Sequence, residues 1–222
     1  MKPLFTAFAL ALLGLSLAVP ASAQLRRPAP AAVQTTAVSL RPFFLAAGQS
    51  FTAKETFTSA FGQSFQPFWG GGLEVVLFHD RVYVDLTASR FKKVGQRVSR
   101  FNGQTFGLGI PLTVTETPLE VSAGYRFRAG KRVNPYAGAG FGSYSYKEVS
   151  DFADPSENVD TRHAGYLAMA GAEFRLHRWI GLSGDVQYTH VIGILGGGGV
   201  SQDANETDLG GVAARVKVIV GR

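Results

Sequence analysis

The stretch LEVSAGYRFR (residues 119–128) alternates between two kinds of side chain. Its odd-numbered positions are apolar, and its even-numbered positions carry a carboxylate, a hydroxyl, a glycine and two arginines. Successive side chains of a β-strand point to opposite faces, so the stretch predicts a strand with one apolar and one polar face. The pattern recurs in LEVVLFHDRVYVDL (residues 73–86) and from Ile180 to Tyr188. Segments of about ten such residues, separated by turns, are typical of strands that cross a membrane in a closed barrel.

Eight segments of this kind predict an all-β fold, an eight-stranded antiparallel up-and-down transmembrane β-barrel. The expected connections are short after every second strand and long after the others, which is the asymmetry of outer-membrane barrels. The fourth strand could begin near Thr113 and project beyond the membrane, and an alternative count of ten strands requires residues 105–115 to pair separately. We expect strands over residues 40–50, 68–78, 81–91, 118–128, 135–147, 163–176, 179–190 and 209–220.

The start of the chain predicts export. Lys2, an apolar run over residues 4–19 and the sequence Ala21-Ser22-Ala23 have the order of a secretory signal peptide, so we expect cleavage after residue 23. Residues 24–38 are rich in Pro and Ala, which predicts a flexible lead-in, and the barrel domain then covers residues 39–222. The chain has no cysteine, which excludes disulfides and thiolate metal sites.

Charge and hydropathy indicate how the chain could cross a membrane and which partners it could bind. Beyond the signal peptide no run reaches the roughly 18 apolar residues of a membrane helix, so any crossing must use strands. The net charge is +6, but the basic residues are dispersed and no helix-turn-helix pattern occurs, so we expect no nucleic-acid partner. We expect a monomer in the outer membrane, in contact with its lipid, with both chain ends on the periplasmic side.

The polar faces of the strands are expected to point inward, because a charge facing lipid at mid-membrane costs about 2–4 kcal/mol. Charges inside a narrow barrel must be paired, and the predicted set nearly balances. This balance favours a packed, salt-bridged interior over an open pore. Residues 135–147 contain too much glycine for their faces to be assigned. The charges predicted inside are Arg41, Glu74, Asp85, Glu120, Arg126, Arg128, Glu173, Arg175, Asp185, Arg215 and Lys217.

Two features are predicted for the outer end. Phe51, Phe57, Phe61 and Phe65 fall in the first long connection, where they either pack a hairpin extension or cap the barrel. A basic loop next to the third strand could face the phosphates of lipopolysaccharide through charge-assisted contacts, or be solvated or paired with other loops. This loop consists of Lys92, Lys93, Arg97 and Arg100.

The sequence offers weak grounds for chemistry. His163 and His190 lie near the expected outer rim, close to an acidic segment that includes Asp151 and Asp160, which would suit a barrel hydrolase. Calcium could bind the same acidic segment, but the spacing and central glycine of a calcium loop are absent. We therefore predict no catalytic residue, no metal, no cofactor and no enzymatic activity.

The chain resembles the small outer-membrane β-barrel proteins of the OmpA-type and opacity-type group over residues 40–222. The resemblance implies an eight-stranded outer-membrane barrel with its loops outside, inserted by the barrel-assembly machinery. Such barrels commonly end on an aromatic residue that this machinery reads, whereas residues 219–222 are IVGR. The resembling motifs are GYRF (124–127), PYAGAGFG (135–142), GAEFRL (171–176) and LGG (209–211).

These motifs are specific for architecture rather than for activity. The sequence therefore predicts an outer-membrane β-barrel with a structural or surface-interaction role, whose long loops present the contact surface. The alternatives are a small pore or channel, a hydrolase with its site at the rim, and a soluble barrel that holds a ligand.

Overall fold

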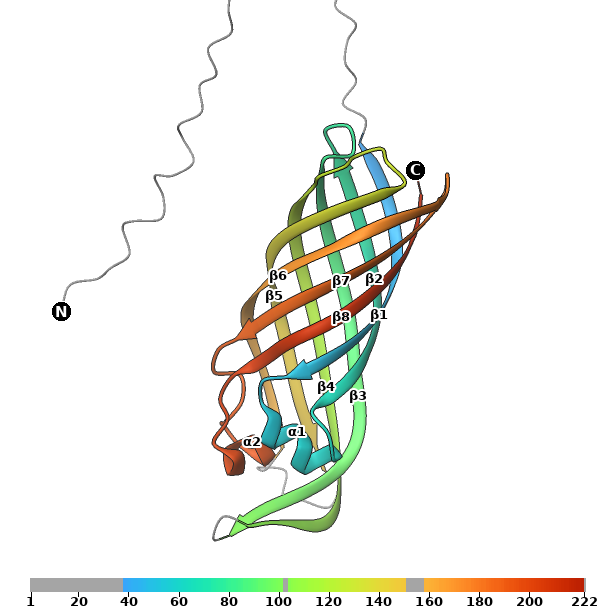
Figure 1. The fold of residues 1–222 in the computed structure, drawn as a ribbon. Coiled ribbons are helices and arrows are strands. Elements are labelled where there is room, and N and C mark those ends of the chain that lie inside the picture. The colour runs from blue at the N-terminus through green and yellow to red at the C-terminus, as the bar shows by residue number, and fades with distance from the viewer. Residues whose placement is uncertain (1–37, 102–103, 151–157, 222) are drawn as a thin grey trace, which may run out of the picture. The chain divides into compact units, whose positions relative to one another are not determined.

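The computed structural model describes residues 38–101, 104–150 and 158–221, which form one closed antiparallel barrel (Figure 1). Each strand pairs with the next along the chain, and β8 pairs with β1 to close the sheet. The predicted eight-stranded up-and-down architecture is confirmed, whereas the expected signal peptide lies outside the described residues. The strands are β1 (Ser39–Phe51), β2 (Phe65–Leu77), β3 (Val82–Phe101), β4 (Gln104–Arg126), β5 (Val133–Val149), β6 (Val159–His177), β7 (Ile180–Val191) and β8 (Leu209–Val220).

The ten-strand alternative is wrong, because residues 105–115 belong to β4 and pair with β3. In place of the expected long loop, β3 and β4 continue to Phe101 and Gln104 as a two-stranded extension. The pairing of β3 with β2 stops at Arg90, and the pairing of β4 with β5 stops at Thr113. We call the part beyond these two residues the ribbon. Its outward face is not uniformly apolar, and so it lacks the sequence pattern of a strand in lipid.

The connections after β2, β4 and β6 are short and lie at the end of the barrel that also holds the start of β1 and the end of β8 (Figure 1). The first of these turns is unusually tight. Phe78, His79 and Asp80 all have positive φ angles, of 50°, 58° and 66°, which reverses the chain within a few residues.

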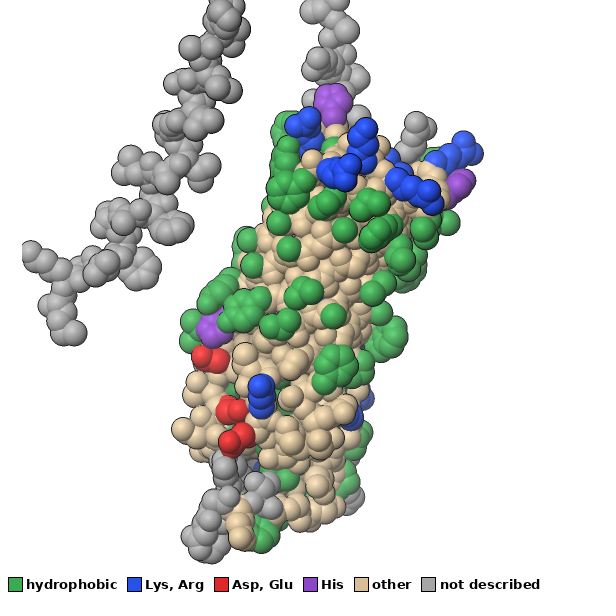
Figure 2. All heavy atoms as spheres, viewed as in Figure 1, with side chains coloured by type: hydrophobic (Ala, Val, Ile, Leu, Met, Phe, Trp, Pro, Cys, Tyr) green, Lys and Arg blue, Asp and Glu red, His purple; other side chains and the backbone are tan. Residues whose placement is uncertain are grey.

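An apolar band surrounds the barrel on its outward face (Figure 2). On β4 and at the first residue after it, the outward residues from Leu119 to Phe127 are apolar, and the next outward positions toward the ribbon are Thr117 and Thr115. On β5 the change occurs after Phe141, where serine and lysine follow. A band of about nine residues per strand matches the length a tilted strand needs to cross hydrocarbon.

The end opposite the short turns carries two short helices (Figure 1). Helix α1 (Lys54–Phe61) lies between β1 and β2, and helix α2 (Gly199–Ala204) lies between β7 and β8. In the described part of the chain, no helix has both the length and the apolar character needed to span a membrane.

The apolar band leads to a prediction about Val121, which pairs with Leu86 and Phe141 inside the band. Val121→Lys is expected to lower the free energy of unfolding by about 2–4 kcal/mol, because the ammonium group would face acyl chains. Thr115→Lys, on the same face but beyond the band, is the matched control; it lies between Lys92 and Lys147, and their repulsion should lower the free energy of unfolding by less than about 1 kcal/mol. Urea titrations of the protein folded into phosphatidylcholine vesicles measure both. Equal losses would contradict the position of the band.

Candidate functional site

The barrel interior holds most of the charges that sequence parity placed there. These side chains come from β1, β2, β3, β4, β6, β7 and β8, so the strands share one polar lumen. Four cations face five carboxylates, which nearly balances the charge. The predicted residues buried inside are Arg41, Glu74, Asp85, Glu120, Arg126, Glu173, Asp185, Arg215 and Lys217.

Four of these charges form a ring near the short-turn end. Arg41 lies 3.2 Å from Glu74 and 2.5 Å from Glu173, measured between the nearest guanidinium nitrogens and carboxylate oxygens. Arg126 Nη2 lies 2.7 Å from an oxygen of each of the same carboxylates. Two cations and two anions therefore alternate, and each charge has two opposite neighbours. This geometry offsets the cost of removing the four groups from water.

A second set of charges lies nearer the helices. Arg215 Nε is 2.5 Å from Asp185 Oδ1, and its Nη1 is 3.8 Å from Glu120 Oε2. Lys217 Nζ donates to Asp85 Oδ2 at 2.6 Å. Arg215 and Lys217 come from the closing strand β8, while Asp85 comes from β3. The pairs Lys217–Asp85 and Arg215–Glu120 therefore cross the lumen, whereas Arg215 and Asp185 are neighbours on adjacent strands.

Tyrosines complete this network, and sequence parity missed them. The hydroxyl of Tyr136 donates to Asp185 at 2.6 Å, and that of Tyr144 donates to Glu120 at 2.8 Å. Both lie on β5, whose glycines hid the two faces from sequence reading. Tyr136 and Tyr144 occupy the same face of β5 as the buried Glu148, so alternation counted back from Glu148 would have placed both tyrosines inside.

Two of the predicted interior residues are not buried. Arg128 is exposed, because β4 ends at Arg126 and the following residues turn, so strand alternation no longer applies. Arg175 is half-buried at the rim, where its Nη2 lies 3.5 Å from Asp80 Oδ2. A register shift between Arg175 and His177 accompanies this position. The assignment of Arg128 to the interior is therefore wrong, whereas Arg175 faces the mouth of the lumen, where it borders the same cavity as Arg41 and Glu173.

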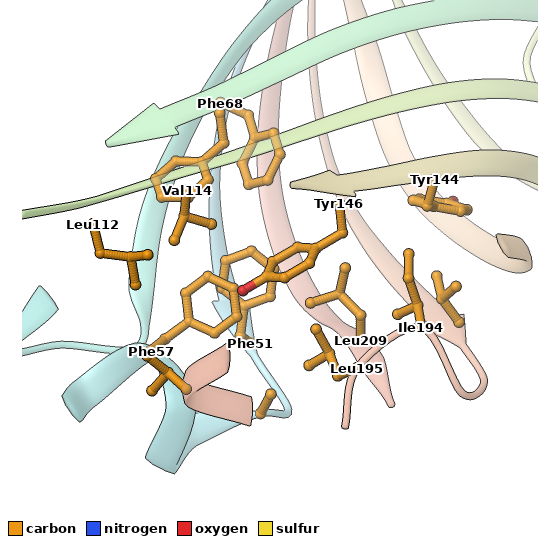
Figure 3. Packing of buried hydrophobic residues seen from close by; sticks show 14 of the residues in the cluster. Phe51, Phe57, Phe68, Leu112, Val114, Tyr144, Tyr146, Ile194, Leu195 and Leu209 are labelled. Carbon is orange, nitrogen blue, oxygen red and sulfur yellow. The ribbon is translucent and has the colours of Figure 1, made fainter. Parts of the chain in front are cut away.

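A hydrophobic plug closes the end that carries the helices (Figure 3). Phe51 and Phe57 are fully buried and stack with their ring centroids 3.8 Å apart. Phe61 packs partly buried against the same cluster, whereas Phe65 is exposed. Residues of the connections thus fold back into the mouth and cap the barrel, one of the two roles expected for these phenylalanines. The buried members also include Phe68, Phe91, Val98, Leu112, Val114, Tyr144, Tyr146, Val191, Ile194, Leu195, Val200 and Leu209.

Polar contacts hold the two helices in the plug. Helix α1 begins after Ala53, which has no side-chain acceptor for the free amides of the first turn. Glu206, from the connection that contains α2, accepts hydrogen bonds from the backbone amides of Glu55 and Thr56 at 3.1 and 2.8 Å. On the barrel wall, buried Glu148 accepts from Val200 N at 3.3 Å. The connections that flank the β1–β8 seam are therefore linked to each other and to β5.

The short-turn end has the opposite character. A cavity of about 720 Å³ opens there, and it is bordered by charged and polar side chains. Arg41 and Glu173 of the charge ring lie at its boundary, together with rim residues such as Asp80 and His177. The lumen is thus open at one end, ion-paired in the middle and filled by apolar side chains at the other end.

The predicted basic loop is part of β3, so its side chains point to different faces. Lys92 is exposed, whereas Lys93 donates to buried Gln66 at 3.1 Å and lies 5.3 Å from the ring centroid of Phe61. Arg97 is half-buried, and its charge acts on the buried carboxylate of Glu148. The side chain of Arg100 lies outside the described residues. The structure does not bring these four cations together on one face.

The histidines and acidic residues do not form a compact catalytic group in the described part of the barrel. His190 Nε2 lies 4.0 Å from Asp208 Oδ2, beyond hydrogen-bond distance. His163 Nδ1 is 3.1 Å from the carbonyl oxygen of Ile192, and Asp160 pairs with Lys147 at 3.0 Å. Among the described residues no cluster of three or more metal-ligating side chains occurs, and residues 151–157 of the acidic segment lie outside them.

Comparisons with known proteins agree on the architecture. Residues 7–215 match the outer membrane protein beta-barrel domain family. Ail, the attachment invasion locus protein of Yersinia pestis, solved in complex with the heparin analogue sucrose octasulfate, has a TM-score of 0.50 at 12% identity, over 83% of this chain and 98% of Ail. Neisserial surface protein A gives 0.49 at 12% identity, over 82% of this chain and 98% of that protein. No curated protein sequence matches significantly. At this identity the likeness to Ail concerns the fold alone.

The charge ring predicts a large effect of removing one member. Arg126→Met leaves Glu74 and Glu173 with Arg41 as their shared cation, and is expected to lower the free energy of unfolding by roughly 3–5 kcal/mol. Arg128→Met removes the same group from an exposed turn and should have no measurable effect. Unfolding in urea, followed by the shift in gel mobility between folded and boiled protein, compares the two variants. A ring variant as stable as the Arg128 variant would contradict a structural role.

The stability of the protein is expected to depend on pH through Glu116, which lies near the plug and beyond the apolar band. Burial, and then the nearby charge of Glu120, raise the pKa of Glu116 from 4.5 to about 8. A carboxyl group with a raised pKa in the folded state contributes fully below its unfolded pKa, so stability is expected to fall between about pH 4.5 and pH 8. Glu116→Gln cannot titrate and should flatten this part of the profile. Unfolding midpoints at pH 5 and pH 8.5 test this, and an equal decline in both proteins would contradict it.

Proposed function

The chain belongs to the outer membrane protein beta-barrel domain family, and on that premise we propose that it is a closed barrel that presents a contact surface outside the cell. The ribbon is the proposed contact element. The short-turn end then faces the periplasm, and the helices and ribbon face outward. Export by a cleaved signal peptide belongs to the same proposal.

The ribbon is the observation that carries this function. Within the described sheet, β3 after Arg90 and β4 before Thr113 pair with each other, so each leaves a strand edge without a further strand. Exposed apolar side chains accompany these edges, with Val94 62%, Phe106 48% and Leu108 49% exposed. Free edges with apolar side chains are the elements of recognition by strand addition. An extended polypeptide segment is therefore the proposed partner class.

Lipopolysaccharide is the proposed lipid partner just below the ribbon. Lys92 faces outward in a cross-strand row with Thr115 and Lys147, at the level where the apolar band ends. Arg90 and Arg162 are exposed near the same level. Cations on neighbouring strands at the membrane surface suit the phosphates of lipopolysaccharide by charge-assisted hydrogen bonds. This row replaces the loop expected from sequence; among the described side chains of that loop, Lys92 faces outward.

A solute pore is less well supported than a closed barrel. Paired charges occupy the lumen, and the plug covers its outer mouth. A hydrolase at the rim is also less well supported, because His190 and Asp208 are too far apart to share a proton directly.

The absence of cysteine in the chain permits a clean test of this topology. Gln104→Cys on the ribbon is expected to react with a membrane-impermeant maleimide on intact cells. Lys131→Cys in a short turn is the matched control and should react only after the outer membrane is permeabilised. Labelling of Lys131→Cys on intact cells would reverse the proposed orientation.

Two further measurements test whether the barrel is closed to solutes and whether the ribbon binds a partner. The purified protein should leave planar bilayers at background conductance, and channel steps would support the pore instead. Cells that display the protein should bind a protein-coated surface, and the triple variant Val94→Ser, Phe106→Ser and Leu108→Ser should lose most of this binding. Gln96→Ser, at an exposed polar position of the same ribbon, is the control. Undiminished binding by the triple variant would contradict the role of the ribbon.

A further inference from the structure

The short-turn end carries a concentration of positive charge that the proposed function does not use (Figure 2). Asp80 is the acidic residue among the described residues of these turns, and it is paired with Arg175. We call the exposed cations the basic rim. They are Arg81, Arg128, Lys131, Arg132 and Arg178.

Backbone and side-chain contacts hold the basic rim in place. Arg81 donates from Nη1 to the hydroxyl of Tyr125 at 3.2 Å, and its carbonyl accepts from Arg126 N at 2.8 Å. The carbonyl of Arg132 accepts from Arg175 N at 2.8 Å, which joins the turn after β4 to β6. The cations therefore come from three separate turns but belong to one fixed edge of the barrel.

Exposed aromatic side chains lie next to these cations. Phe78 is 59% exposed, Phe127 is 62% exposed and Trp179 is 49% exposed, and each is close in sequence to a cation of the basic rim. Aromatic residues favour the headgroup layer of a membrane, so they place the adjacent cations at the level of the lipid phosphates. A partner in bulk periplasm would not need this arrangement.

We propose that the basic rim binds the phosphate groups of anionic phospholipids in the periplasmic leaflet. The assignment to that leaflet rests on the proposed orientation, whereas the preference for anionic headgroups rests on the rim itself. Clustered Lys and Arg at a membrane surface attract anionic lipids. All three short turns contribute cations to the rim, so this attraction acts around the barrel edge. A zwitterionic headgroup would leave that charge without compensation.

The two tryptophans of the chain provide reporters at opposite ends. Trp179 lies in a short turn beside Arg178, and Trp69 lies on β2 at the outer side, paired with Arg90. Trp69→Phe therefore leaves a reporter at the basic rim, and Trp179→Phe leaves one at the outer side. Both variants are reconstituted in phosphatidylcholine vesicles that contain a fixed fraction of phosphatidylglycerol. Each preparation contains either brominated phosphatidylcholine or brominated phosphatidylglycerol. The brominated lipid quenches the fluorescence of a neighbouring tryptophan.

Brominated phosphatidylglycerol is expected to quench Trp179 severalfold more than its bulk fraction predicts, and 0.5 M sodium chloride should reduce this excess. The triple variant Lys131→Gln, Arg132→Gln and Arg178→Gln should abolish the excess at Trp179 and leave the quenching of Trp69 unchanged. Replacing Lys131 by Arg and both arginines by Lys keeps the charge and should restore it.

Three outcomes would overturn the proposal. One is quenching of Trp179 at the bulk fraction, which is the result expected if the rim binds an acidic protein instead. Another is an excess that persists in the glutamine variant. The third is a larger loss in sodium phosphate than in sodium chloride of equal ionic strength, which would assign the rim to free phosphate. Cysteine labelling decides the orientation independently, so a failed topology and a failed lipid preference are distinguishable.

Discussion

Backbone hydrogen bonding in the apolar band is the constraint on which the rest of the structure depends. Hydrocarbon offers no partner for a free amide or carbonyl, so the sheet must have no edge where it crosses the membrane. Pairing of β8 with β1 removes the last two edges. Closure at eight strands leaves a lumen only wide enough for side chains. The inward residues must therefore fill it, and the charges among them must pair with one another.

Glycines and tyrosines show how closely the lumen is filled. A Cβ atom at Gly124 or Gly138 would lie 2.4 Å from the hydroxyl oxygen of Tyr83, so the tyrosine occupies the space that these two positions leave open. The ring of Tyr83 also meets Tyr136 edge to face, with centroids 5.5 Å apart. Glycine at position 138 of β5 is therefore required by the packing of Tyr83 from β3.

Sequence reading could predict the strands, their order and most inward charges, because alternation between lipid and lumen repeats every second residue. It misplaced Arg128 because parity cannot show that a strand ends two residues earlier. It foresaw that the fourth strand could project beyond the membrane from Thr113, but it missed the rest of the ribbon, because strands in water lose the apolar face that marks a membrane strand, as between Gln96 and Pro111. The plug depends on contacts between residues far apart in the sequence, such as Phe57 and Phe91, which no local pattern contains.

The link between Glu206 and helix α1 has a consequence for biogenesis. The free amides of α1, near the start of the barrel, find their acceptor on the connection that precedes the final strand. The helix formed early in the chain thus cannot be capped until the last hairpin has arrived. The complete seal of the mouth therefore depends on both ends of the barrel sequence, since α1 comes from the first connection and its cap from the last.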